Sequence, residues 1–225
     1  MNTTHFILAA AAVTTLSFTA CGPKGDAVAA GDAVAVDSVM ADTTFQVDTV
    51  KTVLGWKGSK VTGDSHNGTI QLANGTLQIV KGDLAGGSFT INMNGMTNLD
   101  LTDAKANGNL LGHLKSEDFF DVAKFPTAGF EITKAEKMAA ADSAGNNYTI
   151  TGNLTIKGVA KSITFPANVT VTKDMATAIA KFTIDRTEWD IRYGSGKFFK
   201  SLGDKMINDL IEFDLNLSTA VVAAS

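Results

Sequence analysis

The sequence is poor in several of the groups on which protein chemistry most often depends. Its 225 residues include one cysteine and three histidines, and no run of lysine or arginine accompanies its net charge of −4. A single cysteine excludes an internal disulfide. The lack of a basic patch argues against a nucleic-acid partner. His66 and His113, the histidines beyond the first 20 residues, are too far apart for a typical metal-ligand spacing, so we expect no metal site.

No arrangement of side chains points to catalysis. Ser195 lies in Gly194-Ser195-Gly196 and has no nearby histidine with which to form a nucleophilic relay. A lone Gly-x-Gly is also too weak a signal for a nucleotide site. Asp118 and Asp121 fit turn capping or solvent exposure better than an acid/base pair, because they are three residues apart beside a turn. We therefore expect that the protein is not an enzyme.

The N-terminal segment lacks charge altogether. Residues 1–20 contain no Lys, Arg, Asp or Glu, and an apolar stretch ends in Thr19-Ala20-Cys21. A short apolar core followed by small residues is typical of a secretory signal and is too short to span a membrane. Cys21 after this stretch resembles the lipidated cysteine of bacterial lipoproteins, the alternative being an ordinary cleaved signal with an incidental cysteine. Gly22 then favours sorting to the outer membrane, facing the periplasm.

Residues 21–44 contain the predicted lipidated cysteine and then an acidic linker. The segment has no aromatic residue before Phe45, and it carries four aspartates against one lysine. This composition is typical of a solvated, flexible coil. A coil of this length spans roughly 25 Å, so we expect it to act as a spacer. The folded domain is then expected over 45–219, followed by a tail at 220–225.

The domain itself alternates between apolar and polar residues, which is the mark of half-buried antiparallel strands. Turn signals such as Asn74-Gly75, Gly86-Gly87 and Lys157-Gly158 separate the alternating segments. The count is eight or nine strands, spaced as in an up-and-down barrel or a sandwich.

One segment breaks this alternation. Residues 102–115 place leucines at helical spacing, and Thr102-Asp103 supplies an N-cap. Ser116 is expected to cap a further short turn, and His113 to anchor the helix end to a backbone carbonyl. The next strand should begin at Phe125-Pro126, because a residue before proline favours extended geometry.

This same region carries a resemblance to a known family. The run from His113 to Phe130, with its His-Leu-Lys-Ser-Glu-Asp-Phe-Phe-Asp-Val start, is similar to the signature of the YceI-like family. Gly152–Lys161 and Phe182–Arg186 resemble two shorter motifs of that family. The resemblance covers about residues 44–219. The lipobox and the acidic linker depart from the many soluble periplasmic members.

The resemblance implies an all-β fold: an eight-stranded antiparallel, lipocalin-like barrel with one helical insertion between strands. It also implies binding of polyisoprenoid or other long-chain amphiphilic lipid inside the barrel, without a cofactor. A barrel of eight strands has room either for packed side chains or for one small ligand. A place in a solid core is therefore an equal alternative for each residue of the expected lining, which consists of Trp56, Phe89, Ile91, Phe120, Phe130, Phe165, Phe182 and Phe213.

Two polar features leave alternatives open. Arg186 either contacts a ligand head group at the barrel mouth or forms a buried pair with a carboxylate that holds the barrel closed. Residues 197–205 combine three lysines with Phe198-Phe199. This basic-aromatic cluster either touches a membrane surface or is a solvated loop with two packed rings.

Taken together, these features predict a lipid carrier or sequestering protein, tethered to a bacterial envelope membrane through Cys21. The expected partners are the lipid and the membrane, with a homodimer left open and no nucleic acid. The alternative is a structural or stress-response scaffold, a barrel with a filled core and no ligand.

Overall fold

A computed structural model describes residues 25–220; Cys21 and the predicted signal lie outside this range. No helix within the range is long and apolar enough to cross a membrane. The described elements are β1 (Gly31–Asp32), β2 (Thr43–Gln46), β3 (Val53–Ser59), β4 (Ser65–Val80), β5 (Asp83–Asn92), η1 (Met93–Gly95), α1 (Ala104–Lys115), β6 (Thr127–Lys137), β7 (Tyr148–Ile156), β8 (Val159–Val171), β9 (Ala176–Asp185), η2 (Arg186–Trp189), η3 (Gly203–Lys205) and β10 (Leu210–Ser218).

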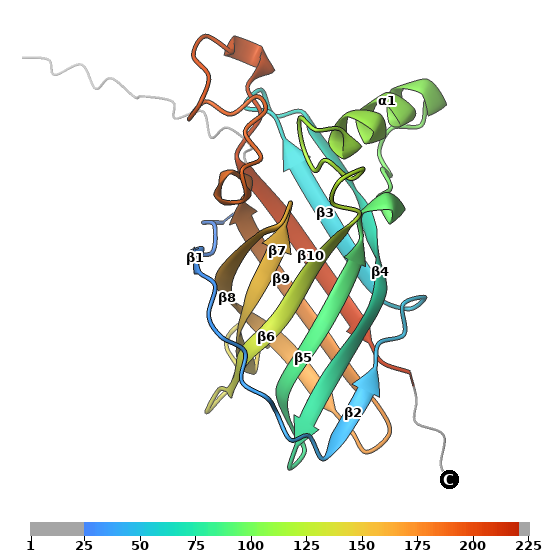
Figure 1. Cartoon of the computed structure of the whole chain (residues 1–225), viewed down its shortest axis with the longest axis vertical. Helices are drawn as coiled ribbons and strands as arrows, with labels where there is room; N and C mark the ends of the chain where they lie inside the picture. Colours follow the sequence, from blue (N-terminus) through green and yellow to red (C-terminus); the bar gives the residue numbers. More distant parts are fainter. Residues whose placement is uncertain (1–24, 221–225) are drawn as a thin grey trace, which may run out of the picture.

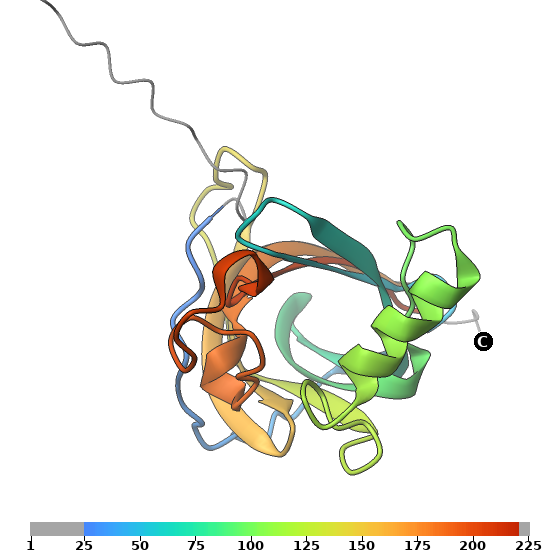
Figure 2. The same cartoon turned by 90° about the horizontal axis from the view of Figure 1, so that it is seen from above.

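Strands β3 to β10 form a closed, eight-stranded antiparallel barrel in which each strand pairs with its neighbours in sequence (Figure 1). β10 pairs with β3 and β8 pairs with β9, which completes the ring. Figure 2 looks along the barrel and shows α1 lying beside its rim. The expected fold class is confirmed.

The alternation of the sequence becomes the inside and outside of this barrel. In β7, Tyr148, Ile150, Leu154 and Ile156 are buried, while the threonines between them are half-buried. Successive side chains of a strand point to opposite faces, so one apolar residue in two is enough to build the core. The apolar face of each strand therefore meets those of its neighbours inside the barrel.

The expected turn at Asn74-Gly75 is wrong. These residues lie inside the 16-residue strand β4, next to a register shift between Leu72 and Asn74. Glycine is required at position 75 because the ring of Phe89 approaches the backbone closely: a Cβ on Gly75 would lie 2.7 Å from that ring. The turn is at Lys81-Gly82, where both residues have positive φ (51° and 83°), as two-residue hairpins require.

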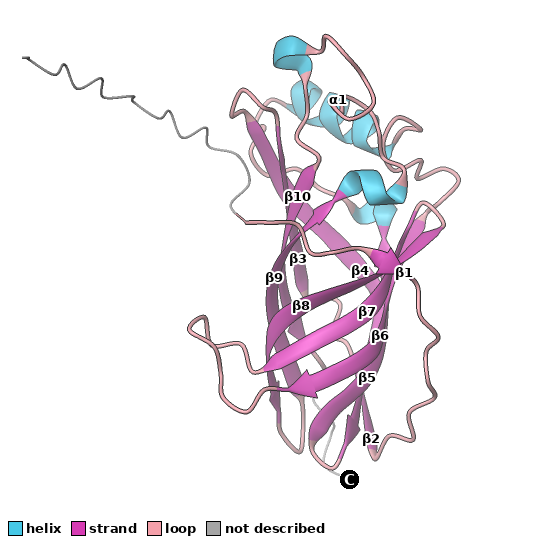
Figure 3. Ribbon diagram, turned by 90° about the vertical axis from the view of Figure 1, so that its left-hand side faces the viewer, coloured by secondary structure: helices cyan, strands magenta, loops and turns pink. Residues whose placement is uncertain are grey.

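The predicted helix is present, and it defines one end of the barrel, here called the helix end (Figure 3). It begins at Ala104, with the Asp103 carboxylate accepting a hydrogen bond from Ala106 N at 2.8 Å. Ser116 ends the helix: its hydroxyl donates to the carbonyl of His113 at 2.8 Å. The β9–β10 connection, residues 186–209, lies at the same end because β9 runs towards it.

β8 and β9 pair over only part of their length. Their ladder runs from Val171↔Ala176 to Ala167↔Ala180, although β8 begins at Val159. It stops beside Pro166, which has no backbone N–H to donate. The remaining halves of the two strands therefore have free backbone groups at the helix end of the barrel.

The N-terminal segment uses those groups, so the flexible linker expected over 21–44 is wrong for its described part, 25–44. Val28 N donates to Thr183 O of β9 at 2.8 Å, and β1 pairs with β8. The side chain of Asn153 bonds both Val34 N (3.1 Å) and Val34 O (2.7 Å). The segment starts at the helix end and runs along the outside of the barrel to the opposite end, where β2 pairs with β4 (Figure 1). The segment therefore lies on the barrel despite its polar composition, because β8 and β9 offer backbone groups that have no partner within the barrel.

Candidate functional site

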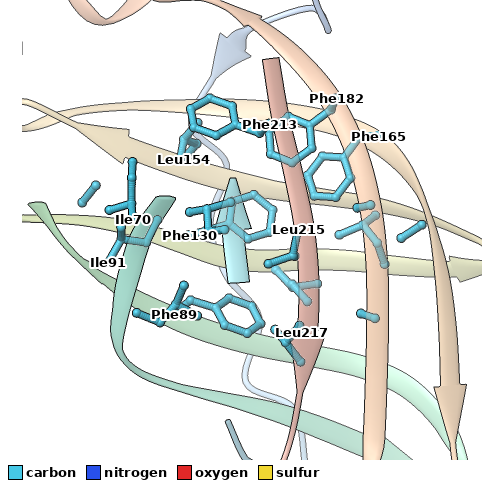
Figure 4. Close-up of a pocket in the computed structure, with 18 of the residues that line it drawn as sticks. Ile70, Phe89, Ile91, Phe130, Leu154, Phe165, Phe182, Phe213, Leu215 and Leu217 are labelled. Carbon is cyan, nitrogen blue, oxygen red and sulfur yellow. The ribbon is translucent and has the colours of Figure 1, made fainter. Parts of the chain in front are cut away.

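An apolar cavity of about 110 Å³ lies inside the barrel. All 24 residues that line it are hydrophobic, and they come from β3 to β10, from Met93 in η1 and from Phe120 after α1 (Figure 4). No hydrogen-bonding side chain is therefore available there, and any occupant is held by apolar contact alone.

Five phenylalanine rings form a belt across this cavity (Figure 4). Neighbouring centroids lie 6.3 Å (Phe89–Phe130), 5.6 Å (Phe130–Phe165), 4.4 Å (Phe165–Phe182) and 5.5 Å (Phe182–Phe213) apart. Strand register sets the contacts, since Phe89 pairs with Phe130 and Phe182 with Phe213. The belt presents ring faces and edges to whatever enters.

A second cavity, of about 420 Å³, lies between this belt and α1 and is here called the upper cavity. Ile70, Phe120 and Phe213 line both cavities, so the two adjoin. The upper cavity is mixed in character. Its polar and charged lining consists of Ser59, Lys60, Asp64, His66, His113, Arg186, Tyr193, Lys205 and Asn208.

The structure divides the expected lining residues between the two cavities. Phe89, Ile91, Phe120, Phe130, Phe165, Phe182 and Phe213 line the central cavity. Trp56 lines the upper one, and its indole N–H donates to Thr97 O at 3.1 Å. That these residues touch a ligand stays a prediction.

Apart from Arg186, sequence reasoning missed the part of the upper cavity wall that comes from the β9–β10 connection. Tyr193 and Ile207 line the cavity, although they lie in an irregular segment without alternation. The charged Asp185–Asp190 motif, which contains Arg186, is the sequence signal that could have directed attention to this connection.

Arg186 makes its contacts within the protein. It is 1% exposed, and its guanidinium donates to the carbonyls of Ile191 (2.8 Å), Asn208 (3.2 Å) and Ile207 (3.3 Å). It also pairs with Asp209 at 3.2 Å. Burial lowers the pKa of Arg186, and the carboxylates of Asp209 and Asp185 oppose that shift. These contacts correspond to the buried-pair alternative; the head-group role of Arg186 stays a prediction.

Asp185, beside it, forms a second ion pair at the same rim. The carboxylate accepts hydrogen bonds from Lys197 and from the backbone and hydroxyl of Thr187. Burial acts to raise the pKa of Asp185, but these bonds together outweigh it and hold the pKa below its usual value. The pair ties residue 197 of the connecting loop to the end of β9.

The expected role of His113 is wrong. Its Nε2 lies 3.2 Å from the Asp118 carboxylate, and its ring edge packs against Phe119 (5.0 Å) and Tyr193 (4.6 Å). The hydroxyl of Ser116, not His113, bonds the backbone carbonyl at this end of the helix, that of residue 113. His113 thus joins α1 to the β9–β10 connection.

Only one of the two adjacent phenylalanines after the helix reaches the central cavity. Phe120 lines both cavities, whereas Phe119 lines only the upper one, where its ring centroid lies 5.8 Å from the Arg186 guanidinium.

His66 pairs with Asp100 at 2.7 Å. Within residues 25–220 no cluster of three metal-ligating side chains occurs.

The fold and sequence match known proteins. The YceI-like domain family matches residues 45–219. A UPF0312 protein of Yersinia pestis is 41% identical over 58 residues, 26% of this chain and 27% of that protein, so the match spans about a quarter of the curated relative's length. Burkholderia cenocepacia BcnA is 24% identical with a TM-score of 0.58, covering 77% of this chain and 99% of that one. A polyisoprenoid binding domain from Saccharophagus degradans, implicated in plant cell wall breakdown, is 14% identical with a TM-score of 0.58, covering 79% and 98%. Because the family match spans most of the sequence, the chain belongs to the YceI-like domain family.

Proposed function

We propose that this protein binds a long-chain amphiphilic lipid of the isoprenoid type without catalysing a reaction, and that lipidated Cys21 tethers it to the outer membrane, facing the periplasm. The observation that carries the proposal is the wholly apolar central cavity adjoining a larger, partly polar one. The apolar chain occupies the central cavity and the polar head lies in the upper one. The Saccharophagus domain, which shares the fold, is a polyisoprenoid binding domain, and this supports the choice of ligand.

Apolar burial is the main favourable contribution to binding. Each methylene group removed from water contributes about 0.8 kcal/mol, so ten carbons contribute roughly 8 kcal/mol before entropic costs. Before those costs are subtracted, this gain corresponds to a dissociation constant of about 1 μM. The upper cavity, at about 420 Å³, also falls within the usual size of ligand sites, roughly 300–1,000 Å³.

A scaffold with a filled core is the second candidate, and the size of the central cavity favours it. Its 110 Å³ is less than the roughly 150 Å³ of an engineered cavity that binds benzene. A chain can enter only if the phenylalanine belt moves aside. The two candidates therefore differ in whether the central cavity accepts a ligand.

The test is organic extraction of the protein purified from its native membrane fraction, followed by mass analysis. The informative variant is Ala180→Phe, because Ala180 lines the central cavity and is 2% exposed. Its neighbour Ile179 is 48% exposed and supplies the matched control, Ile179→Phe. We expect co-purifying lipid in the wild type and in Ile179→Phe, and its loss in folded Ala180→Phe. A wild-type protein free of lipid would favour the scaffold.

The tether is tested separately. Labelled palmitate should be incorporated into the wild type and not into Cys21→Ala. Incorporation into both, or into neither, would contradict lipidation at Cys21.

A further inference from the structure

The tip of the β9–β10 connection, residues 192–202, exposes large aromatic side chains. Tyr193 is 42%, Phe198 45% and Phe199 48% exposed. The backbone N–H groups of Phe198 and Phe199 both donate to Ser195 O, and these bonds form a turn. The two rings are therefore adjacent in sequence and both exposed at the surface. Neighbouring exposed aromatic rings on a folded domain mark a surface that contacts another phase or partner. Residues 192–202 are here called the aromatic loop.

The aromatic loop also carries three basic residues, Arg192, Lys197 and Lys200, and no acidic residue. Arg192 pairs with Asp190 and Lys197 with Asp185, both just outside the loop, whereas Lys200 forms no ion pair within the described residues. The guanidinium of Arg192 lies 4.7 Å from the ring centroid of Phe198, so charge and aromatic surface occupy one patch. Basic residues next to aromatic ones are the combination that binds an interface of anionic lipid head groups.

The loop lies at the opening of the lipid site rather than on a remote face. Tyr193 and Lys205, on either side of Phe198 and Phe199 in sequence, line the upper cavity. Figure 1 shows the connection, coloured orange to red, above the barrel and at the same end as α1. A lipid leaving a bilayer at this loop therefore meets the upper cavity first.

The N-terminal segment brings the membrane to the same end. Val28 bonds Thr183 near the end of β9, which places the first described residues at the helix end. Only three residues separate Cys21 from Gly25. Four peptide steps span at most about 14 Å, far less than the coil expected from the sequence. A lipid anchor on Cys21 would hold the helix end close to the bilayer.

We propose that the aromatic loop docks the helix end of the barrel on an anionic lipid bilayer, so that the upper cavity opens against the membrane. This orientation rests on the proposed tether and explains how a poorly soluble lipid reaches the cavity without crossing water. A second copy of the chain on the same patch is the competing occupant, and the experiment separates the two.

The experiment places an environment-sensitive label at Phe199→Cys or, at the opposite end of the barrel, at Ser143→Cys. Cys21 is the natural cysteine, so parent protein treated in the same way supplies the background. The protein with its anchor is reconstituted into vesicles of phosphatidylglycerol and phosphatidylcholine that contain a spin-labelled lipid quencher. We expect quenching at 199 to be severalfold stronger than at 143, and to weaken on phosphatidylcholine alone or in high salt.

Charge variants sharpen the test. Lys200→Glu should reduce the quenching at 199 severalfold, whereas Lys173→Glu makes the same charge change at the opposite end and should leave it unchanged. Equal quenching at 199 and 143, or no dependence on lipid charge, overturns the proposal. Shielding of the label that rises with protein concentration and needs no vesicles also overturns it, in favour of a second copy.

A failure of the proposed lipid binding can be distinguished from a failure of membrane docking. Bound lipid is measured by mass on the same preparations, so a barrel that docks but carries no lipid is recognised as such. If palmitate labelling shows no anchor on Cys21, the labelled variants are mixed with the same vesicles at saturating lipid. The proposal then still requires stronger quenching at 199 than at 143, and the absence of quenching at both positions overturns it.

Discussion

The rings of Phe165 and Phe182 stack 4.4 Å apart, at an interplanar angle of 14°, at a level where β8 and β9 no longer pair. The last rung of the β8–β9 ladder is Ala167↔Ala180. Phe165 lies two residues before Ala167 and Phe182 two residues after Ala180, so the register places the two phenylalanines opposite each other. Stacking of side chains thus takes over from backbone hydrogen bonding in joining the two strands. The same two rings belong to the wall of the central cavity.

Loss of this stack should destabilise the barrel. Phe182→Ala is expected to lower the free energy of unfolding by about 3 kcal/mol, the lower end for Phe→Ala in a core, because Phe182 is half-buried. Urea unfolding followed by circular dichroism measures the change. The control, Phe199→Ala at an exposed ring, should stay within about 0.5 kcal/mol of the wild type. Equal effects of the two variants would mean that the stack does not hold β8 to β9.

Arg186 should be needed for folding stability. Arg186→Met leaves the Asp209 carboxylate without its partner and three carbonyls without a donor, and we expect a loss of about 3–5 kcal/mol. Arg192→Met, at an exposed position, is the matched control. Thermal unfolding of the two variants makes the comparison. A head-group role alone would instead leave stability intact and lower the amount of bound lipid.

Acid should weaken the rim through Asp185. The pKa of this carboxyl is lower in the folded protein than in the unfolded chain. Its contribution to stability is therefore complete above the unfolded value, about 4, and is lost as the pH falls through the folded value. The difference in melting temperature between wild type and Asp185→Asn should shrink as the pH falls below about 4. A gap that stays constant down to the lowest pH would contradict this assignment.

Gly68 should tolerate no side chain. It pairs with Trp56, and a Cβ at this position would lie 1.8 Å from Thr97 O and 2.7 Å from the indole nitrogen. Gly68→Ala should cost about 1–3 kcal/mol and shift the tryptophan fluorescence, because it pushes apart the Trp56–Thr97 hydrogen bond. Gly58→Ala, where a Cβ meets nothing within 4 Å, is the control and should change neither.

The N-terminal segment should detach when its side-chain clamp is removed. Asn153→Ala deletes both hydrogen bonds to Val34, and we expect a loss of about 1–2 kcal/mol. Hydrogen exchange should accelerate at the amides of Val28 and Val34 while the amides of β7 keep their protection. Asn109→Ala, at an exposed helix position, is the control. Unchanged exchange at Val34 would show that β1 alone holds the segment.

The strands were predictable wherever an apolar face is buried throughout. In β7 the alternation maps directly onto burial, because the strand has one face towards the core. At Asn74-Gly75 the local signal was misleading. The bulk of Phe89 on the neighbouring strand and of Val47 explains why glycine stands there, and no local pattern carries that information.

The site was predictable in composition and less so in arrangement. The expected lining residues could be named from period and motif, yet their division between two cavities depends on where α1 and the β9–β10 connection cross the barrel end. Likewise, both alternatives for Arg186 suit its neighbours in sequence. The partner, Asp209, is 23 residues away and meets it only in the folded barrel.

The all-β architecture, the helical insertion at 104–115 and the apolar nature of the interior follow from the sequence, because period-two and helical spacing are local properties of the chain. Tertiary structure alone decided the incomplete β8–β9 ladder, the docking of residues 25–44 on it and the common end shared by that segment, the upper cavity and the aromatic loop. These features depend on contacts between residues far apart in the chain. Such contacts form only when closure of the barrel leaves particular backbone groups without partners and brings others together.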